Sequence, residues 1–224
     1  MVRQLTLALS MSFTVLVAGD AFAVAIVPTD LATWITGPSF LPHIDDVFVT
    51  PPTPVSSPMG ALGNDVYFDS ATGNYTYLET VTPSLANNQL FNTGFSAEGF
   101  TGTAGFSFAD AAASGGAGAP CLGGGTGPGC AFEITNIAGQ LSWYTNFPSR
   151  DNPSGWDGGE TIRFFYVSTN PPEMGDYNLT TTKVGTGQSY APMAAVPEPG
   201  SLALLGSGIV GLVAAMRRRR RLRA

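Results

Sequence analysis

Short runs of alternating apolar and polar residues recur along the chain between clusters of glycine, proline, asparagine and serine. The clearest run is DVYFDSATGNYTYLETV at 65–81, where Val66 and Phe68 flank Tyr67 and a Ser-Ala-Thr-Gly-Asn turn leads into a second alternating run. Alternation with a period of two predicts a strand, and two such runs joined by a glycine-containing turn predict a β-hairpin.

The same pattern in AFEITNIAGQLSWYTNF, at 131–147, predicts a second hairpin. ETIRFFYVST, at 160–169, is apolar at most positions of both faces, which predicts a central strand. Further strands are expected at 47–50, 91–95, 100–103, 106–108 and 177–184, and a proline-rich loop at 51–58. Outside the termini no window has a sustained helical period, so the chain is predicted to be all-β, an antiparallel sandwich or jelly roll.

The two ends of the chain differ from the region between them, residues 24–195, which we call the body. Arg3, an apolar run at 5–17 and Ala21-Phe22-Ala23 have the order of a signal peptide, so residues 1–23 are expected to be removed by signal peptidase after Ala23. The remaining residues 24–195 have a length typical of one domain.

The C-terminal residues 196–224 have three parts. Val196 to Gly200 contain two prolines and predict an exposed hinge, whereas 201–216 carry no charge and would form a helix of about 24 Å. Residues 217–224 hold six arginines, which the positive-inside rule places in the cytoplasm. The sequence therefore predicts a single transmembrane helix at 201–216, with the body outside the inner membrane.

This tail resembles the C-terminal sorting signal of the PEP-CTERM proteins of Gram-negative bacteria, in which Pro197, Glu198 and Pro199 would be the sorting motif. The resemblance covers 196–224 and the expected signal peptide. It implies an exosortase as partner, which would cut near the motif in bacteria that make exopolysaccharide. The protein would be anchored transiently in the membrane and then reach the cell surface or the medium. The resemblance supplies no role for the body.

The charge of the body limits the kinds of molecule that it can bind. Residues 24–195 contain fourteen acidic and three basic residues, a formal charge of −11, which the arginines of the tail conceal in the whole-chain value of −6. Such a body repels nucleic acid and anionic lipid, which excludes a nucleic-acid-binding protein. Neutral polymers, cations and further copies of the protein remain as partners.

Cys121 and Cys130 are the two cysteines of the chain, and they bracket LGGGTGPG. In an exported protein such a pair is expected to form a disulfide, which would stabilise the fold by about 2 to 3 kcal/mol. The surrounding ASGGAGAPCLGGGTGPG lacks the lysine of a phosphate-binding loop and is expected to be a flexible insertion.

Enzymatic chemistry has little support in the sequence. His43 is the single histidine and is expected in a surface loop, which leaves no histidine-rich zinc site and no evident Ser-His-Asp triad. Glycoside hydrolysis needs only two carboxylates, for which Glu79, Glu133 and Glu160 are candidates. With fourteen acidic residues in the body, some pair will lie at the required distance by chance, so such a pair does not indicate a glycoside hydrolase. We therefore expect no catalytic residues and no enzyme.

The loop SRDNPSGWDGGET gathers the oxygen donors Asp151, Asn152, Asp157 and Glu160, the chemistry that Ca²⁺ prefers, although their spacing is not that of an EF-hand. Solvated hairpin loops have the same composition, so the first expectation is no cofactor and the alternative is calcium. Trp156 in this loop is a candidate platform for stacking on sugars. Trp34 and Trp143 are further candidates, and the patterned strand around Trp143 favours a place in the core.

Two functions follow from these observations. The first is a non-enzymatic surface or extracellular-matrix protein that associates with exopolysaccharide. The alternative is a calcium-assisted carbohydrate-binding module. A small glycoside hydrolase is less favoured than either function.

Overall fold

In a computed structural model the chain forms an almost entirely β fold, which confirms the predicted class. The structure describes residues 23–35, 38–51, 57–84, 92–121, 124–145, 156–180 and 184–193. The strands are β1 (Val24–Ile26), β2 (Thr29–Asp30), β3 (Ile44–Val49), β4 (Pro58–Asp69), β5 (Asn74–Pro83), β6 (Asn92–Ser96), β7 (Phe100–Phe106), β8 (Phe132–Ile137), β9 (Gln140–Thr145), β10 (Ile162–Ser168), β11 (Pro172–Thr180) and β12 (Val184–Pro192). Short helices are η1 (Leu31–Thr33), α1 (Phe108–Ala113), η2 (Gly116–Gly118) and η3 (Pro128–Cys130).

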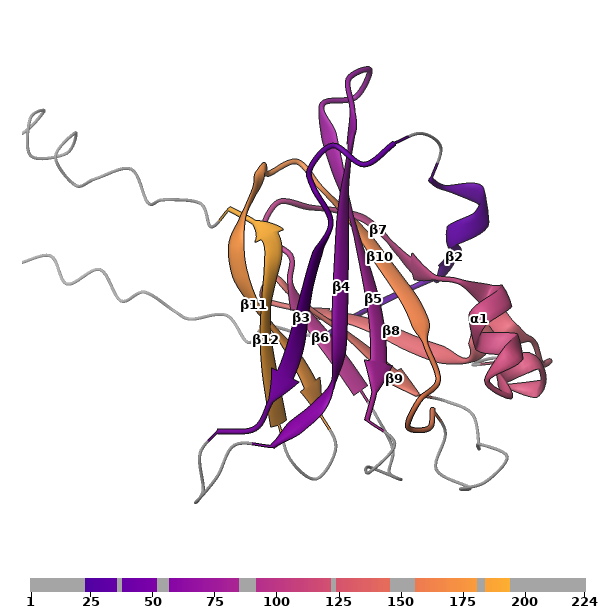
Figure 1. The fold of residues 1–224 in the computed structure, drawn as a ribbon. Coiled ribbons are helices and arrows are strands. Elements are labelled where there is room, and N and C mark those ends of the chain that lie inside the picture. Colours follow the sequence, from indigo (N-terminus) through magenta and orange to yellow (C-terminus); the bar gives the residue numbers. More distant parts are fainter. Residues whose placement is uncertain are drawn as a thin grey trace, which may run out of the picture.

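All the strands belong to one curled sheet in the order β1-β8-β9-β6-β11-β12-β3-β4-β5-β10-β7-β2 (Figure 1). Every pairing between the described strands is antiparallel except that of β2 with β7. The first and last strands of this order, β1 and β2, are consecutive in the chain. The N-terminal segment therefore covers both edges of the curled sheet.

The two contacts of the N-terminal segment are close. Val24 to Ile26 pair with Ile134 to Asn136 on β8, and Thr29 lies opposite Gly105 on β7. A Cβ atom at Gly105 would overlap the carbonyl oxygen of Thr29. Glycine is therefore required at this position for β2 to approach β7.

Aromatic side chains fill the inside of the curled sheet. Phe95, Trp143, Phe164, Tyr166 and Tyr177 are fully buried. The ring of Phe95 lies 4.9 Å from the rings of both Trp143 and Tyr177, and Trp143 lies 5.8 Å from Phe164. Offset and edge-on aromatic pairs of this kind contribute about 0.5 to 1.5 kcal/mol each beyond their buried area. The interior is therefore occupied by side chains, and ligands have to bind elsewhere.

The central position predicted for β10 is confirmed, since it pairs with β5 on one side and β7 on the other. Its alternate residues face the aromatic interior, while Phe165 faces outward into a second, small cluster with Leu31 of η1 and Leu78 of β5. This outer cluster explains why β10 is apolar on both faces: η1 packs on the outside of the sheet.

The predicted hairpins at 65–81 and 131–147 correspond to β4–β5 and β8–β9. Four predicted elements need correction. The strands expected at 100–103 and 106–108 are one strand, β7, followed by α1, and the single strand expected at 177–184 is the hairpin of β11 and β12. The insertion expected to be flexible includes η2 and η3.

A charge pair holds α1 against β10. Arg163 donates to Asp110 from Nε at 2.7 Å and from Nη2 at 2.8 Å, and Ser107 caps the helix by accepting from the amide of Asp110. Burial raises the pKa of Asp110, but the hydrogen bond and charge of Arg163 outweigh it, so that the pKa is lowered. The forked geometry of guanidinium and carboxylate fixes the orientation of α1.

Replacement of Gly105 by alanine tests the closure of the sheet. We expect Gly105→Ala to lower the free energy of unfolding by about 2 kcal/mol or more, because the added Cβ forces β2 away from β7. Urea denaturation measures the change. Gly118→Ala is the control, since a Cβ there meets nothing within 4 Å; equal stability of the two variants would contradict the role given to the N-terminal segment.

Candidate functional site

A groove of about 490 Å³ lies on the outside of the sheet, between η1 and the β4–β5 hairpin. We call it the Trp34 groove. Its floor is formed by outward-facing side chains of three neighbouring strands, Tyr67 of β4, Thr76 of β5 and Val167 of β10. Trp34 forms one wall and the turn of the hairpin closes one end.

The indole of Trp34 is fixed although it is 40% exposed. Its Nε1 donates a hydrogen bond to Thr76 Oγ1 at 3.1 Å, and its ring stacks on the buried ring of Phe165 at a centroid distance of 6.0 Å and an interplanar angle of 22°. Because one side of the indole is anchored in this way, a partly exposed aromatic surface is held in one orientation beside the groove.

The hairpin turn supplies polar groups to the same groove. Asp69 accepts hydrogen bonds from the hydroxyl of Thr72 at 2.7 Å and from the amide of Ala71 at 2.9 Å. These hydrogen bonds, that of Thr72 first, lower the pKa of Asp69. Asn74 lies opposite Asp69 across the hairpin and also lines the groove. The groove thus combines an aromatic wall with a carboxylate, an amide and hydroxyl groups.

The structure corrects the expectation for Trp156. This tryptophan is fully buried, its Nε1 donates to the carbonyl oxygen of Glu160 at 2.8 Å, and its ring packs edge-on against Phe132 and Phe164. A buried ring cannot stack on a sugar. Trp143 is also in the core, so Trp34 is the exposed tryptophan of the chain.

The candidate calcium ligands are only partly described. Asp151 and Asn152 lie outside the described residues. Asp157 and Glu160 lie side by side, with the amide of Asp157 donating to Glu160 Oε2 at 3.0 Å, and the buried Oδ1 of Asp157 has no hydrogen-bond partner. Within the described ranges no three acidic, histidine or cysteine residues are grouped so that they could hold a metal ion.

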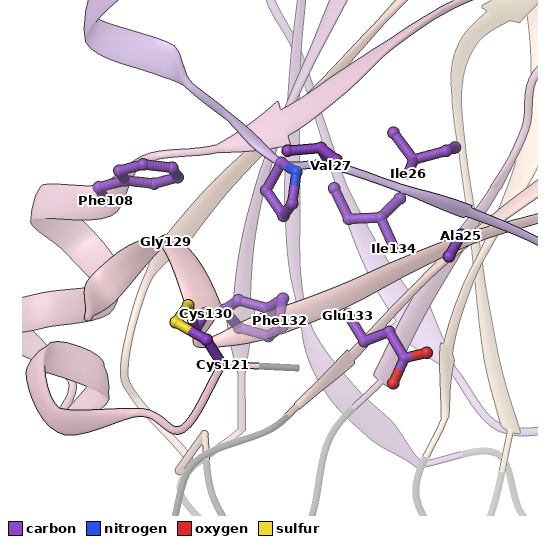
Figure 2. A pocket seen from close by; sticks show the side chains of 11 residues that line it. Ala25, Ile26, Val27, Phe108, Cys121, Gly129, Cys130, Phe132, Glu133 and Ile134 are labelled. Atoms are coloured by element: carbon purple, nitrogen blue, oxygen red, sulfur yellow. A yellow bond between two sulfur atoms is a disulfide. The ribbon is translucent and has the colours of Figure 1, made fainter. Parts of the chain in front are cut away.

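The sulfur atoms of Cys121 and Cys130 lie at bonding distance, with the Cα atoms 4.9 Å apart. They border an apolar pocket of about 420 Å³ between the N-terminal segment, the end of η3 and β8 (Figure 2). Glu133 is the one charged residue that lines it, and its carboxylate points away from Phe108 and the two cysteines in Figure 2. The lining suits an apolar molecule and offers little to a sugar.

Glu79 lies inside the sheet and is fully buried. Asn64 Nδ2 of β4 donates a hydrogen bond to its Oε1. Burial raises the pKa of Glu79 well above its ordinary value and outweighs the hydrogen bonds from Tyr177 and Asn64, which lower it. Glu79 lines neither the Trp34 groove nor the apolar pocket, so within the described structure it is an interior acid beyond the reach of a ligand there.

His43 lies on the outer face between two aspartates, as a partly exposed surface residue. Its Nδ1 is 3.0 Å from Asp65 and its Nε2 is 3.0 Å from Asp45. The hydrogen bond with Asp65 is the largest cause of the raised pKa of His43; burial opposes it and Asp45 adds to it. A carboxylate beside each ring nitrogen stabilises the imidazolium form relative to the neutral ring.

Comparison with known protein families identifies the class of the protein. Residues 195–221 match the family model of the PEP-CTERM protein-sorting motif. This motif implies export, passage through the membrane and an exosortase as processing partner. No curated protein and no solved structure matches the chain.

The sorting motif Pro197, Glu198 and Pro199, the predicted membrane helix at 201–216 and the signal peptide before Ala23 lie outside the described residues. Among the residues that the structure does describe, no helix has the length and apolar character needed to span a membrane.

Glu79 makes the stability of the protein depend on pH. Its raised pKa means that the folded protein holds a proton that the unfolded chain releases above pH 4.5, so the free energy of unfolding falls as pH rises from that value through the folded-state pKa. We expect Glu79→Gln to remove this dependence. Relative to wild type the variant should gain stability with rising pH, by up to about 1.4 kcal/mol per pH unit.

Urea denaturation of both proteins between pH 4 and pH 9 measures the difference. His43 titrates in both proteins, so its contribution cancels. A difference between wild type and variant that is constant over this range would show that Glu79 titrates as an exposed acid.

Proposed function

We propose that the protein is a non-enzymatic surface or matrix protein that binds extracellular polysaccharide through the Trp34 groove. The observation that carries the proposal is the fixed, half-exposed indole beside a turn that presents Asp69 and Asn74. Aromatic rings stack on the apolar faces of sugars, while carboxylates and amides hydrogen-bond to their hydroxyl groups. The groove contains both kinds of group.

The charge of the body favours a neutral polysaccharide. With a formal charge of −11 over residues 24–195, the body repels polymers that carry carboxylates or sulfates. Asp69 is kept ionised by the hydrogen bonds of its turn, which adds a negative charge at the groove itself. Neutral sugar chains meet no such repulsion.

Export and sorting bring the body to the place where such a polymer is found. The tail matches the family model of the sorting motif, and exosortase processing is expected to release the body outside the inner membrane. Association with exopolysaccharide then gives the released protein a means of staying near the cell.

A non-enzymatic role agrees with the distribution of carboxylates. The Trp34 groove has Asp69 and the apolar pocket has Glu133, one carboxylate each, while Glu79 is enclosed in the core. Hydrolysis of a glycosidic bond generally requires two acids that flank the same bond. Within the described structure neither hollow brings two together.

Calcium assistance is a second candidate function, favoured by the buried Oδ1 of Asp157, which has no hydrogen-bond partner. Ca²⁺ prefers such carboxylate oxygens, and Asp151 and Asn152 precede Asp157 in the same loop. Titration of the mature protein with CaCl₂ in a calorimeter tests for the ion. Absence of heat, and binding of polysaccharide that EDTA leaves unchanged, would rule this candidate out.

Substitution of Trp34 tests the glycan site. We expect Trp34→Ala to weaken binding of polysaccharide purified from the medium of the producing bacterium by about tenfold or more, because a stacked ring contributes on the order of 1 kcal/mol beyond its contact area. Trp143 and Trp156 are buried, so a change in tryptophan fluorescence on binding reports on Trp34.

Met174→Ala is the matched control, since Met174 is exposed and lies outside the groove. Undiminished binding by Trp34→Ala, with the fluorescence change preserved, would place the polysaccharide elsewhere.

Replacement of Pro197, Glu198 and Pro199 by alanine tests the sorting motif. The membrane helix and the arginines remain intact, so we expect a protein that is anchored in the correct orientation but keeps its tail. Mass spectrometry of the mature protein measures this. Wild type should lack the residues beyond the motif, and a wild-type protein that ends at Ala224 in cells with an exosortase would contradict the assignment.

A further inference from the structure

A second hollow, of about 200 Å³, lies on the outside of the sheet where β9, β6 and β11 run side by side. The pairing of these strands aligns their outward-facing residues in rows. Gly94 of β6 lies between Ser142 of β9 and Asn178 of β11, and in the next row Asn92 lies between Tyr144 and Thr180. We call this feature the Gly94 hollow.

The hollow exists because the central position is glycine. The residues before and after it, Thr93 and Phe95, face the interior and are buried, so Gly94 is the outward-facing position. A Cβ atom there would lie 3.2 Å from the carbonyl oxygen of Leu141 and 3.3 Å from Ser142 Oγ. Glycine within a strand weakens it and commonly marks a close approach by a ligand or another backbone.

Most polar side chains around Gly94 make no hydrogen bond in the part of the chain that the structure describes. Within the described part of the chain, the side chains of Gln140, Ser142, Tyr144, Asn178 and Thr180 make no hydrogen bond. Asn92 Oδ1 accepts from the amide of Thr145 at 3.2 Å, which orients the amide group of Asn92 and leaves its Nδ2 able to donate. Hydrogen-bond donors and hydrogen-bond acceptors therefore both surround the Gly94 hollow.

The lining selects the class of ligand. It contains no charged residue, and the described part of the chain has a single lysine or arginine, Arg163, which is paired with Asp110. Among the lining residues a phosphate or sulfate would find no cation, and an apolar molecule would bury polar groups without partners. A neutral molecule with several hydroxyl groups satisfies amides and hydroxyls together, and Tyr144, 42% exposed, adds an aromatic surface.

We propose that the Gly94 hollow is a second binding site for neutral glycan chains, so that one molecule binds two chains and cross-links them. The proposal rests on the proposed function for the ligand class, but the site is separate from the Trp34 groove. In the sheet order β12 and β3 separate β11 from β4, and Figure 1 shows β11 and β12 on one side of the curled sheet and β5 and β10 on the other. The two sites share no lining residue.

The closing experiment measures the number of sites on the mature protein. The probes are neutral oligosaccharides prepared from the purified polysaccharide, and isothermal titration gives the stoichiometry. We expect two sites for wild type, one for Asn178→Ala and for Tyr144→Ala, one for Trp34→Ala, and none for a variant that combines Trp34→Ala with Asn178→Ala. Val47→Ala, an exposed position on β3, is the control and should keep both sites.

The two proposals fail in different ways. One site in wild type that Trp34→Ala removes and Asn178→Ala preserves would overturn the Gly94 hollow and leave the proposed function standing. One site that Asn178→Ala removes and Trp34→Ala preserves would overturn the Trp34 groove instead. Absence of binding in wild type would overturn both. Cross-linking is measured with the intact polymer: wild type should raise the viscosity of its solution, and either single-site variant should not.

Discussion

The fold depends on the pairing of one short N-terminal segment with both edges of the sheet. A curled sheet that is not closed exposes unpaired amide and carbonyl groups on β8 and β7, which would attract strands from other molecules. β1 and β2 satisfy part of both edges with a few pairs each, and the close approach at Gly105 shows how tightly β2 lies. β1 begins at Val24, directly after the expected cleavage site at Ala23, so cleavage there would place the new N-terminus at this closure.

Closure also decides where ligands can bind. The sheet encloses stacked and edge-on aromatic rings, and the buried Glu79 is held among them. The interior is therefore a packed core, and binding chemistry is confined to the outer face and to the junction beside the N-terminal segment. On the outer face each hollow has a local cause: η1 folds Trp34 over β5 and β10, and a glycine opens the space between β9 and β11.

The sequence pattern predicted the strands that are long enough to show a regular pattern of apolar and polar residues. The hairpins β4–β5 and β8–β9 were predictable because their inward and outward residues differ in polarity, and the central strand β10 was predictable because both of its faces are mostly apolar. β1 and β2 are too short to show a period, and α1, six residues long, is too short for a helical one. The sequence Thr-Thr-Lys at 181–183, between β11 and β12, carries no turn signal.

The candidate sites were less predictable, because they depend on long-range pairing. A tryptophan in a polar loop is expected to be exposed, but the hydrogen bond from Trp156 to Glu160 and the rings of Phe132 and Phe164 bury it. Trp34 lies in a segment without a pattern, and its role depends on Thr76, 42 residues away in the chain. The Gly94 hollow depends on the registers of two strand pairings, and no local signal distinguishes Gly94 from the other glycines before those registers are known.

The distribution of charge along the chain bears both on export and on the two proposed binding sites. The arginines are concentrated in the tail, where they are expected to orient the predicted membrane segment, and exosortase processing would separate them from the acidic body. The body carries three basic residues, Arg150, Arg163 and Lys183, against fourteen acidic ones, and Arg163 is engaged by Asp110. A released body of this charge repels its own kind. Under the proposed function, proteins that repel one another but bind the same neutral polymer would spread along it, and the two proposed binding sites on each protein would then join separate chains of that polymer.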